Sequence, residues 1–570
     1  MFKKIFTLFL VGFAAILHGA SYLIEAEYTT CPGKFMLESN KLASNKFILR
    51  SFDTPATAYG KFEIPESGTY NIYLRNFGYG TSSRQIALEI DGKKFAPVGD
   101  EKNNAFQWSK YDGQITLQKG VHSFKFITAG SNVRFDALLL TTGDSPEIKA
   151  VSLIPYGGHR YSGKLRFRVK TDKNPLTYTC GEDIKFIATA RVKAKTVKNA
   201  AIAVNRFGDD GKRETVCIPF ENGKAVYTTQ LSKPGFVRAK INLCDTDGNT
   251  IIFVDDKGVC FSGYFDGGAG ADTEKIPQMP EPEDFDAFWA KQKARLDAVP
   301  VKAEMTLLKD TLWKNHDTYA VSVDCAGPRP VTGYLTLPKN AKEKSLDAIV
   351  CFPGYGLGRQ TPSAPTLGDQ IVFRINAHGM PLGKDKQFYD QFFAPLRGYA
   401  LNDSENADTC YFNGMALRVM RALQFVKSLP LWNGKNLTAY GGSQGGLQAL
   451  WAAGLDPDVS YCTITVPWGC NRGETELGLM GRDSVILSYH PAARYYDPVN
   501  FAKRIKCKVD VHRAGLADYI CPPSGVSRMY HNLKCPKSIT WVQNNNHFPP
   551  QNDCKSFSFK DDNNHTQKKR

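Results

Sequence analysis

One short run of small residues in the last third of the chain suggests a serine nucleophile. Ser443 stands in the pattern Gly441-x-Ser443-x-Gly445, directly after the strand-like run 437–440 and directly before a helical pattern. Glycines on both sides leave room for a sharp turn in which the serine oxygen points away from the sheet. The pattern therefore predicts nucleophilic chemistry at Ser443. The alternative is a glycine turn that carries a surface serine.

The base and the acid that such a serine needs follow it in the chain. Serine becomes a nucleophile when a histidine takes its proton and a carboxylate orients that histidine. Asp518 comes at the end of the strand-like run 508–515, and His547 follows the run 538–543. Because an acid and then a histidine follow the serine in folds with this turn, we expect Ser443, Asp518 and His547 to form a triad. The competing interpretations are a helix-capping Asp518 and an ordinary loop His547.

Two backbone N–H groups are expected to hold the negative charge that develops during attack. Gln444 begins the helical pattern after Ser443, so its N–H lies at the positive end of a helix. The second donor should come from the loop 353–356, Pro-Gly-Tyr-Gly, which follows the apolar run 348–352. The sequence therefore predicts an oxyanion hole made by the N–H groups of Gln444 and Tyr355.

The elements that must hold these groups alternate between strands and helices. An amphipathic helix pattern at 285–296 is followed by apolar strand-like runs, separated by helical patterns, as far as about residue 555. This alternation indicates βαβ units and a largely parallel sheet that is buried on both faces. Ligands bind such sheets beyond the C-terminal ends of the strands, where the three triad residues are expected. We therefore assign residues 285–555 to a catalytic α/β domain.

Two β-rich segments precede this domain. Alternating runs broken by turns predict a jelly-roll sandwich at 21–145 and an immunoglobulin-like sandwich at 150–264. The second segment shows no site chemistry, which favours a spacer. A run rich in Gly, Pro and acids predicts a linker at 265–284. The expected fold class is therefore multidomain, with two N-terminal β-sandwich domains followed by an α/β-hydrolase domain with a largely parallel sheet.

The first sandwich resembles jelly-roll carbohydrate-binding modules. The resemblance lies in its opening run YLIEAEY (22–28) and its closing run VRFDALLL (133–140). In such modules a calcium ion often sits between carboxylates of these two strands. Glu25, Glu27 and Asp136 occupy the matching places, and carboxylate oxygens suit calcium. The resemblance thus implies a structural calcium ion, and the alternative is three outward-facing strand carboxylates.

Composition and charge limit the class of protein. With 570 residues and 42% hydrophobic residues the chain is too long for one core and too apolar to be disordered. Residues 1–20 combine Lys3 and Lys4 with an apolar run and small residues around Ala20, which predicts a cleaved signal peptide and a secreted or periplasmic protein. We expect no transmembrane span. The net charge of +16 comes without a nucleic-acid-binding motif, so no nucleic-acid partner is expected.

From about residue 280 to 550 the chain resembles the acetyl xylan esterase and cephalosporin C deacetylase family of α/β-hydrolases. The resemblance is carried by PEDFDAFW (282–289), GYGLGR (354–359), INAHGMP (375–381), YGGSQGG (440–446) and AGLADYICPPS (514–524), together with the late His547. By that likeness Ser443 is the nucleophile, Asp518 and His547 complete the triad, and Tyr355 and Gln444 supply the oxyanion hole. Catalysis of this kind needs no cofactor.

The likeness also implies a substrate class and an assembly. It implies removal of acetyl groups from acetylated xylan, xylo-oligosaccharides or other acetylated sugars, by a protein that forms homo-oligomers. The chain departs from the family at Pro353, where a histidine is common, and at Phe548, where an acid is common. Two other functions fit the same residues: a general carboxylesterase or peptidase on this scaffold, and a catalytically inactive glycan-binding protein.

Overall fold

The chain forms two compact units. The computed structural model describes residues 20–561 apart from 27–28, 30–34, 40–41, 45–46, 52–54, 78–84, 100–104, 129, 131–132, 147–149, 154–159, 163, 193–194, 198, 247, 249–250, 255–259, 309–312, 359–360, 363–367, 402, 472–490 and 550–553. One unit holds the described residues up to 166 together with those of 191–202 and 243–263, and the other holds those of 167–190, 203–242 and 264–561. Residues 1–19 of the predicted signal peptide lie outside the described residues.

Two β-sheets enclose the core of the first unit. One sheet runs in the order β11 (Val151–Ser152), β1 (Ser21–Glu25), β10 (Arg134–Thr141), β3 (Phe47–Ser51) and β2 (Phe35–Ser39), with β5 (Gly68–Phe77) and β8 (Phe106–Leu117) attached through β10. The other runs in the order β4 (Ala56–Ile64), β9 (Gly120–Thr128), β6 (Ile86–Ile90) and β7 (Lys93–Val98). Alternate side chains of both sheets, such as Ile72 and Phe126, are buried in one hydrophobic cluster. The β-sheet content expected for 21–145 is thus confirmed.

The second β-rich segment also forms sheets. A four-stranded sheet runs β17 (Arg213–Pro219), β16 (Ala200–Gly208), β19 (Gly235–Asp245) and β22 (Tyr264–Ala271). Another contains β13 (Leu165–Thr171), β14 (Ile184–Val192), β15 (Lys195–Thr196) and β18 (Ala225–Thr229). A small third sheet contains β12 (Arg160–Ser162), β20 (Ile252–Val254) and β21 (Cys260–Ser262).

The predicted linker at 265–284 is wrong in its first part. β22 pairs antiparallel with β19 from Gly235↔Ala271 to Asn242↔Tyr264, so residues 265–271 belong to a strand. Its glycines have a packing reason, because a Cβ on Gly268 would lie 2.4 Å from the carbonyl oxygen of Leu516. A run that looked flexible in the sequence therefore allows a close approach of two backbones.

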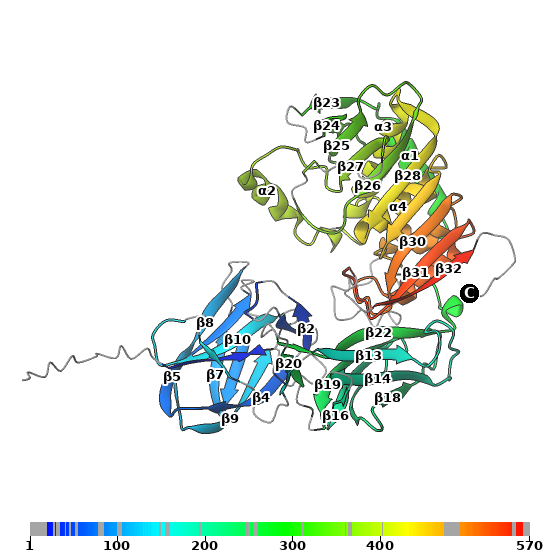
Figure 1. Cartoon of the computed structure of the whole chain (residues 1–570). Coiled ribbons are helices and arrows are strands. Elements are labelled where there is room, and N and C mark those ends of the chain that lie inside the picture. The colour runs from blue at the N-terminus through cyan, green and yellow to red at the C-terminus, as the bar shows by residue number, and fades with distance from the viewer. Residues whose placement is uncertain are drawn as a thin grey trace, which may run out of the picture. The chain divides into compact units, whose positions relative to one another are not determined.

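A ten-stranded sheet forms the core of the C-terminal segment (Figure 1). Its order is β23 (Ala303–Leu307), β24 (His316–Val323), β25 (Val331–Pro338), β27 (Ile371–Asn376), β26 (Leu346–Phe352), β28 (Trp432–Gly442), β29 (Tyr461–Thr465), β30 (Lys508–Gly515), β31 (Lys537–Gln543) and β32 (Lys555–Asp561). Neighbouring strands are parallel from β27 to β31 and antiparallel at both edges. The largely parallel sheet expected here is observed.

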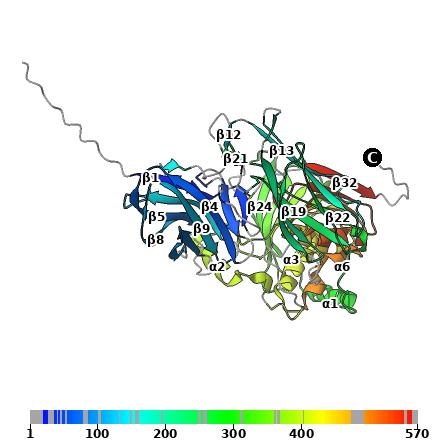
Figure 2. The ribbon, with the colours of Figure 1, turned by 90° about the horizontal axis from the view of Figure 1, so that it is seen from below.

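Helices accompany this sheet. They are α1 (Phe285–Asp297), α2 (Lys386–Phe393), α3 (Tyr411–Ser428), α4 (Gln444–Leu455), α5 (Ala493–Tyr496), α6 (Pro498–Ala502) and α7 (Pro523–Asn532). The helix predicted from residue 285 is confirmed, and it lies beside α6 (Figure 2). The ring centroids of Phe285 and Trp289 lie 5.2 and 5.3 Å from that of Phe501 in α6. Within the described part of the chain, no helix is long and apolar enough to cross a membrane.

Candidate active site

Ser443 occupies a strained turn between β28 and α4. Its φ is 55° and its ψ is −121°, a conformation that residues other than glycine rarely adopt. The turn is closed by the first helical hydrogen bond, from the Leu447 N–H to the Ser443 carbonyl at 3.1 Å. A Cβ on Gly441 would lie 2.2 Å from the Gly445 backbone, and one on Gly445 would lie 2.2 Å from the Phe352 carbonyl oxygen. The flanking glycines are therefore required by space as well as by turn geometry.

Asp518 and His547 come together at the ends of β30 and β31. His547 Nδ1 donates to Asp518 Oδ2 at 2.9 Å, and the Asp518 side chain is only 1% exposed. The other carboxylate oxygen accepts the N–H groups of Ile520 at 2.9 Å and Cys521 at 2.8 Å. These bonds fix both the carboxylate and the ring, so Nε2 of His547 is left as the nitrogen that can take a proton.

Cys521 connects this pair to Ser443. Its sulfur lies within 4.8 Å of ligand atoms of Asp518 and His547. Burial raises the pKa of the Cys521 thiol well above its usual value, while the neighbouring Ser443 side chain acts to lower it. Among the described residues, Ser443 Oγ makes no hydrogen bond to His547, so direct contact of nucleophile and base stays a prediction.

The two expected oxyanion donors are tied to one another. Gln448, in the first turns of α4, donates from Nε2 to the Pro353 carbonyl at 3.0 Å and to the Gln444 carbonyl at 3.2 Å. The Tyr399 hydroxyl donates to the buried Gln444 side chain, and the Tyr399 ring stacks on that of Tyr355 with 5.2 Å between centroids. The loop 353–356 and the start of α4 are thus held as one piece beside Ser443.

Comparison with known proteins identifies the family of this part of the chain. The family described as acetyl xylan esterase (AXE1) matches residues 273–477 and 488–562. This part of the chain belongs to the acetyl xylan esterase family. A relative, acetyl esterase Axe7A of Xylanibacter ruminicola, is 29% identical over 351 residues, which cover 58% of this chain and 75% of the relative. The chain is therefore a carboxylic ester hydrolase.

Solved structures with similar parts include esterases and a carbohydrate-binding module. The acetyl xylan esterase from Paenibacillus sp. R4 is 24% identical with a TM-score of 0.41, over 49% of this chain and 94% of that one. Acetyl xylan esterase 1 from Thermoanaerobacterium sp. is 20% identical with a TM-score of 0.40, over 49% of this chain and 93% of that one. A family 35 carbohydrate-binding module from Clostridium thermocellum is 15% identical with a TM-score of 0.18, over 21% of this chain and 98% of that one.

Two supporting residues of the esterase were not predicted from the sequence. His378 donates from Nε2 to the Gly356 carbonyl at 3.0 Å and accepts from the Tyr411 hydroxyl at 2.7 Å, and burial lowers the pKa of His378 to about 4. It is therefore a neutral support for the loop 353–356. The motif INAHGMP, in which it stands, was the available signal.

Arg513 supports the base loop in a similar way. Its Nη1 donates to the carbonyls of Phe548 at 2.6 Å and His547 at 3.2 Å, and to Asn545 Oδ1 at 3.2 Å. It stands at the end of β30, and nothing in the sequence around it indicated this role. Arg513 thus holds the chain segment that carries His547.

Glu25 and Asp136, two of the three residues expected to bind calcium in the first unit, lie together. Ser44 donates its hydroxyl to Glu25 Oε2 at 2.5 Å and its N–H to Asp136 Oδ2 at 3.0 Å. Burial is the main cause that raises the pKa of Glu25 to about 7. Asp136 is also paired with Arg75, which already supplies the positive charge that calcium would supply. The described part of the set fits calcium only incompletely, Glu27 lies outside the described residues, and the site stays a prediction.

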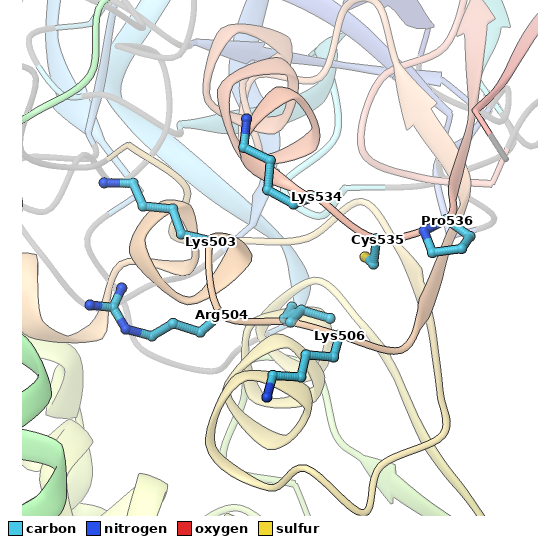
Figure 3. Close-up of a pocket in the computed structure, with 7 residues that line it drawn as sticks. Lys503, Arg504, Lys506, Lys534, Cys535 and Pro536 are labelled. Carbon is cyan, nitrogen blue, oxygen red and sulfur yellow. The ribbon is translucent and has the colours of Figure 1, made fainter. Parts of the chain in front are cut away.

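A basic pocket of about 490 Å³ is lined by residues 503–506 and 534–536, which Figure 3 draws. Its lining comes from the segments directly before β30 and β31, whereas Asp518 and His547 follow these strands. Lys503 and Arg504 of this lining form ion pairs with Glu281. Because parallel strands start at one edge of a sheet and end at the other, this pocket is separate from the catalytic site.

Proposed function

We propose that the protein is an exported serine esterase of the α/β-hydrolase fold that removes acetyl groups from acetylated carbohydrates. The single observation that carries the proposal is the pair formed by buried Asp518 and half-buried His547, held at 2.9 Å at the strand ends beside the Ser443 turn. A strained serine before a helix, followed in the chain by an acid and a histidine, is the arrangement that activates serine in this fold.

The proposed reaction passes through an acyl-enzyme. His547 Nε2 takes the hydroxyl proton of Ser443, and Ser443 Oγ attacks the carbonyl carbon of the acetyl group. The N–H groups of Gln444 and Tyr355 hold the oxyanion, each contributing about 3 kcal/mol in the transition state. His547 then gives its proton to the departing sugar oxygen, which leaves Ser443 acetylated. Water, activated in the same way, releases acetate and restores the serine.

The substrate class rests on the family and on the curated relative. The matching family is described as acetyl xylan esterase, and the relative is named acetyl esterase Axe7A. We therefore propose acetylated xylan or xylo-oligosaccharides as substrates. The all-β first unit fits a jelly-roll module that keeps the enzyme on a polysaccharide, and the expected signal peptide fits action outside the cytoplasm.

Hydrolysis of short esters tests the proposal. Wild-type protein is compared with Ser443→Ala on p-nitrophenyl acetate and p-nitrophenyl butyrate, and acetate release is then measured from acetylated xylan. The proposal expects a clear preference for acetate and loss of at least about 10³-fold in the variant. Equal rates on both esters favour a general carboxylesterase, and cleavage of a peptide amide favours a peptidase. Activity of Ser443→Ala equal to that of wild type refutes the assignment of Ser443 as the nucleophile. Glycan binding without cleavage of any ester favours the inactive binding protein.

A further inference from the structure

Strand β22 of the second β-rich segment contacts the chain just before His547. β22 lies near the C-terminal end of β31 in the same compact unit (Figure 1). Gln543, the last residue of β31, donates from Nε2 to the Gly268 carbonyl at 2.8 Å and accepts the Gly268 N–H on Oε1 at 2.8 Å. The next residue, Asn544, accepts the Asp266 N–H on Oδ1 at 2.9 Å. Three hydrogen bonds therefore anchor the start of the loop that carries the base.

The sheet that contains β22 contacts the chain on both sides of Asp518, through β22 on one side and through Arg238 of β19 on the other. On one side the Leu516 carbonyl lies against Gly268, so closely that a Cβ there would be 2.4 Å from its oxygen. On the other side the Tyr519 ring lies under the guanidinium of Arg238, 5.0 Å from the ring centroid. Arg238 is in turn held by two 2.7 Å bonds to Asp266 of β22, and both side chains are buried. The segment that carries the acid thus also rests on this sheet.

The two loops also fix each other. The Leu516 N–H donates to the Val542 carbonyl at 2.9 Å, and the Ala517 N–H donates to the Asn545 carbonyl at 3.0 Å. A shift of either loop is therefore transmitted to the other. These contacts therefore set the distance between the Asp518 carboxylate and the His547 ring.

We infer that the second β-rich segment is a working part of the catalytic unit, in which β22 positions the acid and the base through Gln543 and Asn544. These two residues are positioning residues, because they act through the loops of Asp518 and His547. The inference rests on the proposed function, which gives Asp518 the role of the acid and His547 the role of the base. It replaces the expectation of a spacer, since a spacer needs no buried hydrogen bonds to the loops of the active site.

The structure suggests substitutions that remove these anchors with little other change. Gln543→Met keeps the length of the side chain and loses both bonds to Gly268. Asn544 has a φ of 56°, so Asn544→Gly removes its side chain without backbone strain, and Asn544→Asp keeps the acceptor for the Asp266 N–H. Ser527→Ala is the matched control, because Ser527 in α7 donates to the carbonyl of Thr273, just after β22, at 3.2 Å and touches neither loop.

The test measures kcat and KM for p-nitrophenyl acetate in the full chain. A displacement of catalytic groups by about 1 Å costs about 100-fold, so we expect kcat of Gln543→Met/Asn544→Gly to fall at least about tenfold, with KM within about threefold of wild type. Ser527→Ala should stay within about twofold, and Asn544→Asp alone should stay close to wild type because its acceptor is preserved. Hydrogen exchange at residues 516–519 and 545–547 should be faster in the double variant only.

The outcomes separate this inference from the proposed function. A wild-type protein that cleaves no ester refutes the proposed function, and the positioning role falls with it. An active wild type whose double variant matches Ser527→Ala in kcat and in hydrogen exchange overturns the inference alone. If circular dichroism shows that the double variant is unfolded, the kcat of Asn544→Gly alone is compared with that of Asn544→Asp. Equal kcat values in these two variants overturn the inference.

Discussion

The Asp518→Asn variant keeps the shape of the side chain but makes its two outer atoms different. In the native chain one oxygen accepts the N–H groups of Ile520 and Cys521, and the other accepts from His547 Nδ1 at 2.9 Å. The asparagine must keep its carbonyl oxygen on the two backbone donors, which turns its NH₂ group toward His547. Nδ1 then has to accept, so the ring proton moves to Nε2. That nitrogen is the one that has to take the Ser443 proton.

The expected loss follows from this wrong tautomer. We expect kcat for p-nitrophenyl acetate to fall by about 10⁴-fold, which is about 5.5 kcal/mol of activation free energy at about 1.36 kcal/mol per tenfold. KM should stay within about threefold of the wild-type value. Asp518 is buried behind His547, so the substitution removes no contact with the substrate.

The matched control is Asp510→Asn, on the same strand β30. Asp510 accepts from Tyr461 and Ser538 and lies toward the start of the strand, away from the triad. Its variant should keep kcat within about twofold of wild type. An Asp518→Asn variant that retains more than about a tenth of wild-type kcat would refute the reasoning about the tautomer.

Three further predictions test the surroundings of the site. Gly445→Ala should lower the free energy of unfolding by about 3 kcal/mol in urea titrations, since its Cβ would lie 2.2 Å from the Phe352 carbonyl oxygen; an unchanged midpoint contradicts this packing. Tyr355→Ala should lower kcat by less than about tenfold, because the donor is a backbone N–H, and a loss like that of Ser443→Ala would assign the role to the phenol. Burial lowers the pKa of His378 from 6.5 to about 4, so below pH 6.5 the unfolded chain binds a proton that the native chain does not. The free energy of unfolding should therefore fall from pH 6.5 toward pH 4, with up to about 3 kcal/mol of the fall due to this residue. His378→Asn should lack this part of the pH dependence.

The core of the candidate site could be predicted because its signals are local. Ser443 is marked by glycines within two residues of it, and these glycines are needed at a turn that the chain makes between adjacent elements. Asp518 and His547 each follow a strand-like run, and the parallel order of the strands brings such positions to one edge of the sheet. Local pattern and one topological rule were enough to select these three residues.

Other features depend on contacts between distant segments. The run 265–271 was predicted as part of a linker because residues 265–284 are rich in Gly, Pro and acids, whereas in the fold Gly268 lets β22 approach Leu516. Arg513 and Gln543 act through backbone carbonyls and amides of other segments. Backbone groups look the same at every position of a sequence, so a side chain that binds them leaves no pattern to read.

By itself, the sequence determined the glycine turn around Ser443, the alternation of strands and helices, and the chain order of Ser443, Asp518 and His547. These depend on backbone conformation and apolar periodicity, which neighbouring residues set. Only the tertiary structure decided that His547 and Asp518 meet at 2.9 Å and that β22 supports both of their loops. Asp518 and His547 are 29 residues apart and Gly268 and Gln543 are 275 apart, and the packing energy that sets such contacts depends on shape in three dimensions rather than on proximity along the chain.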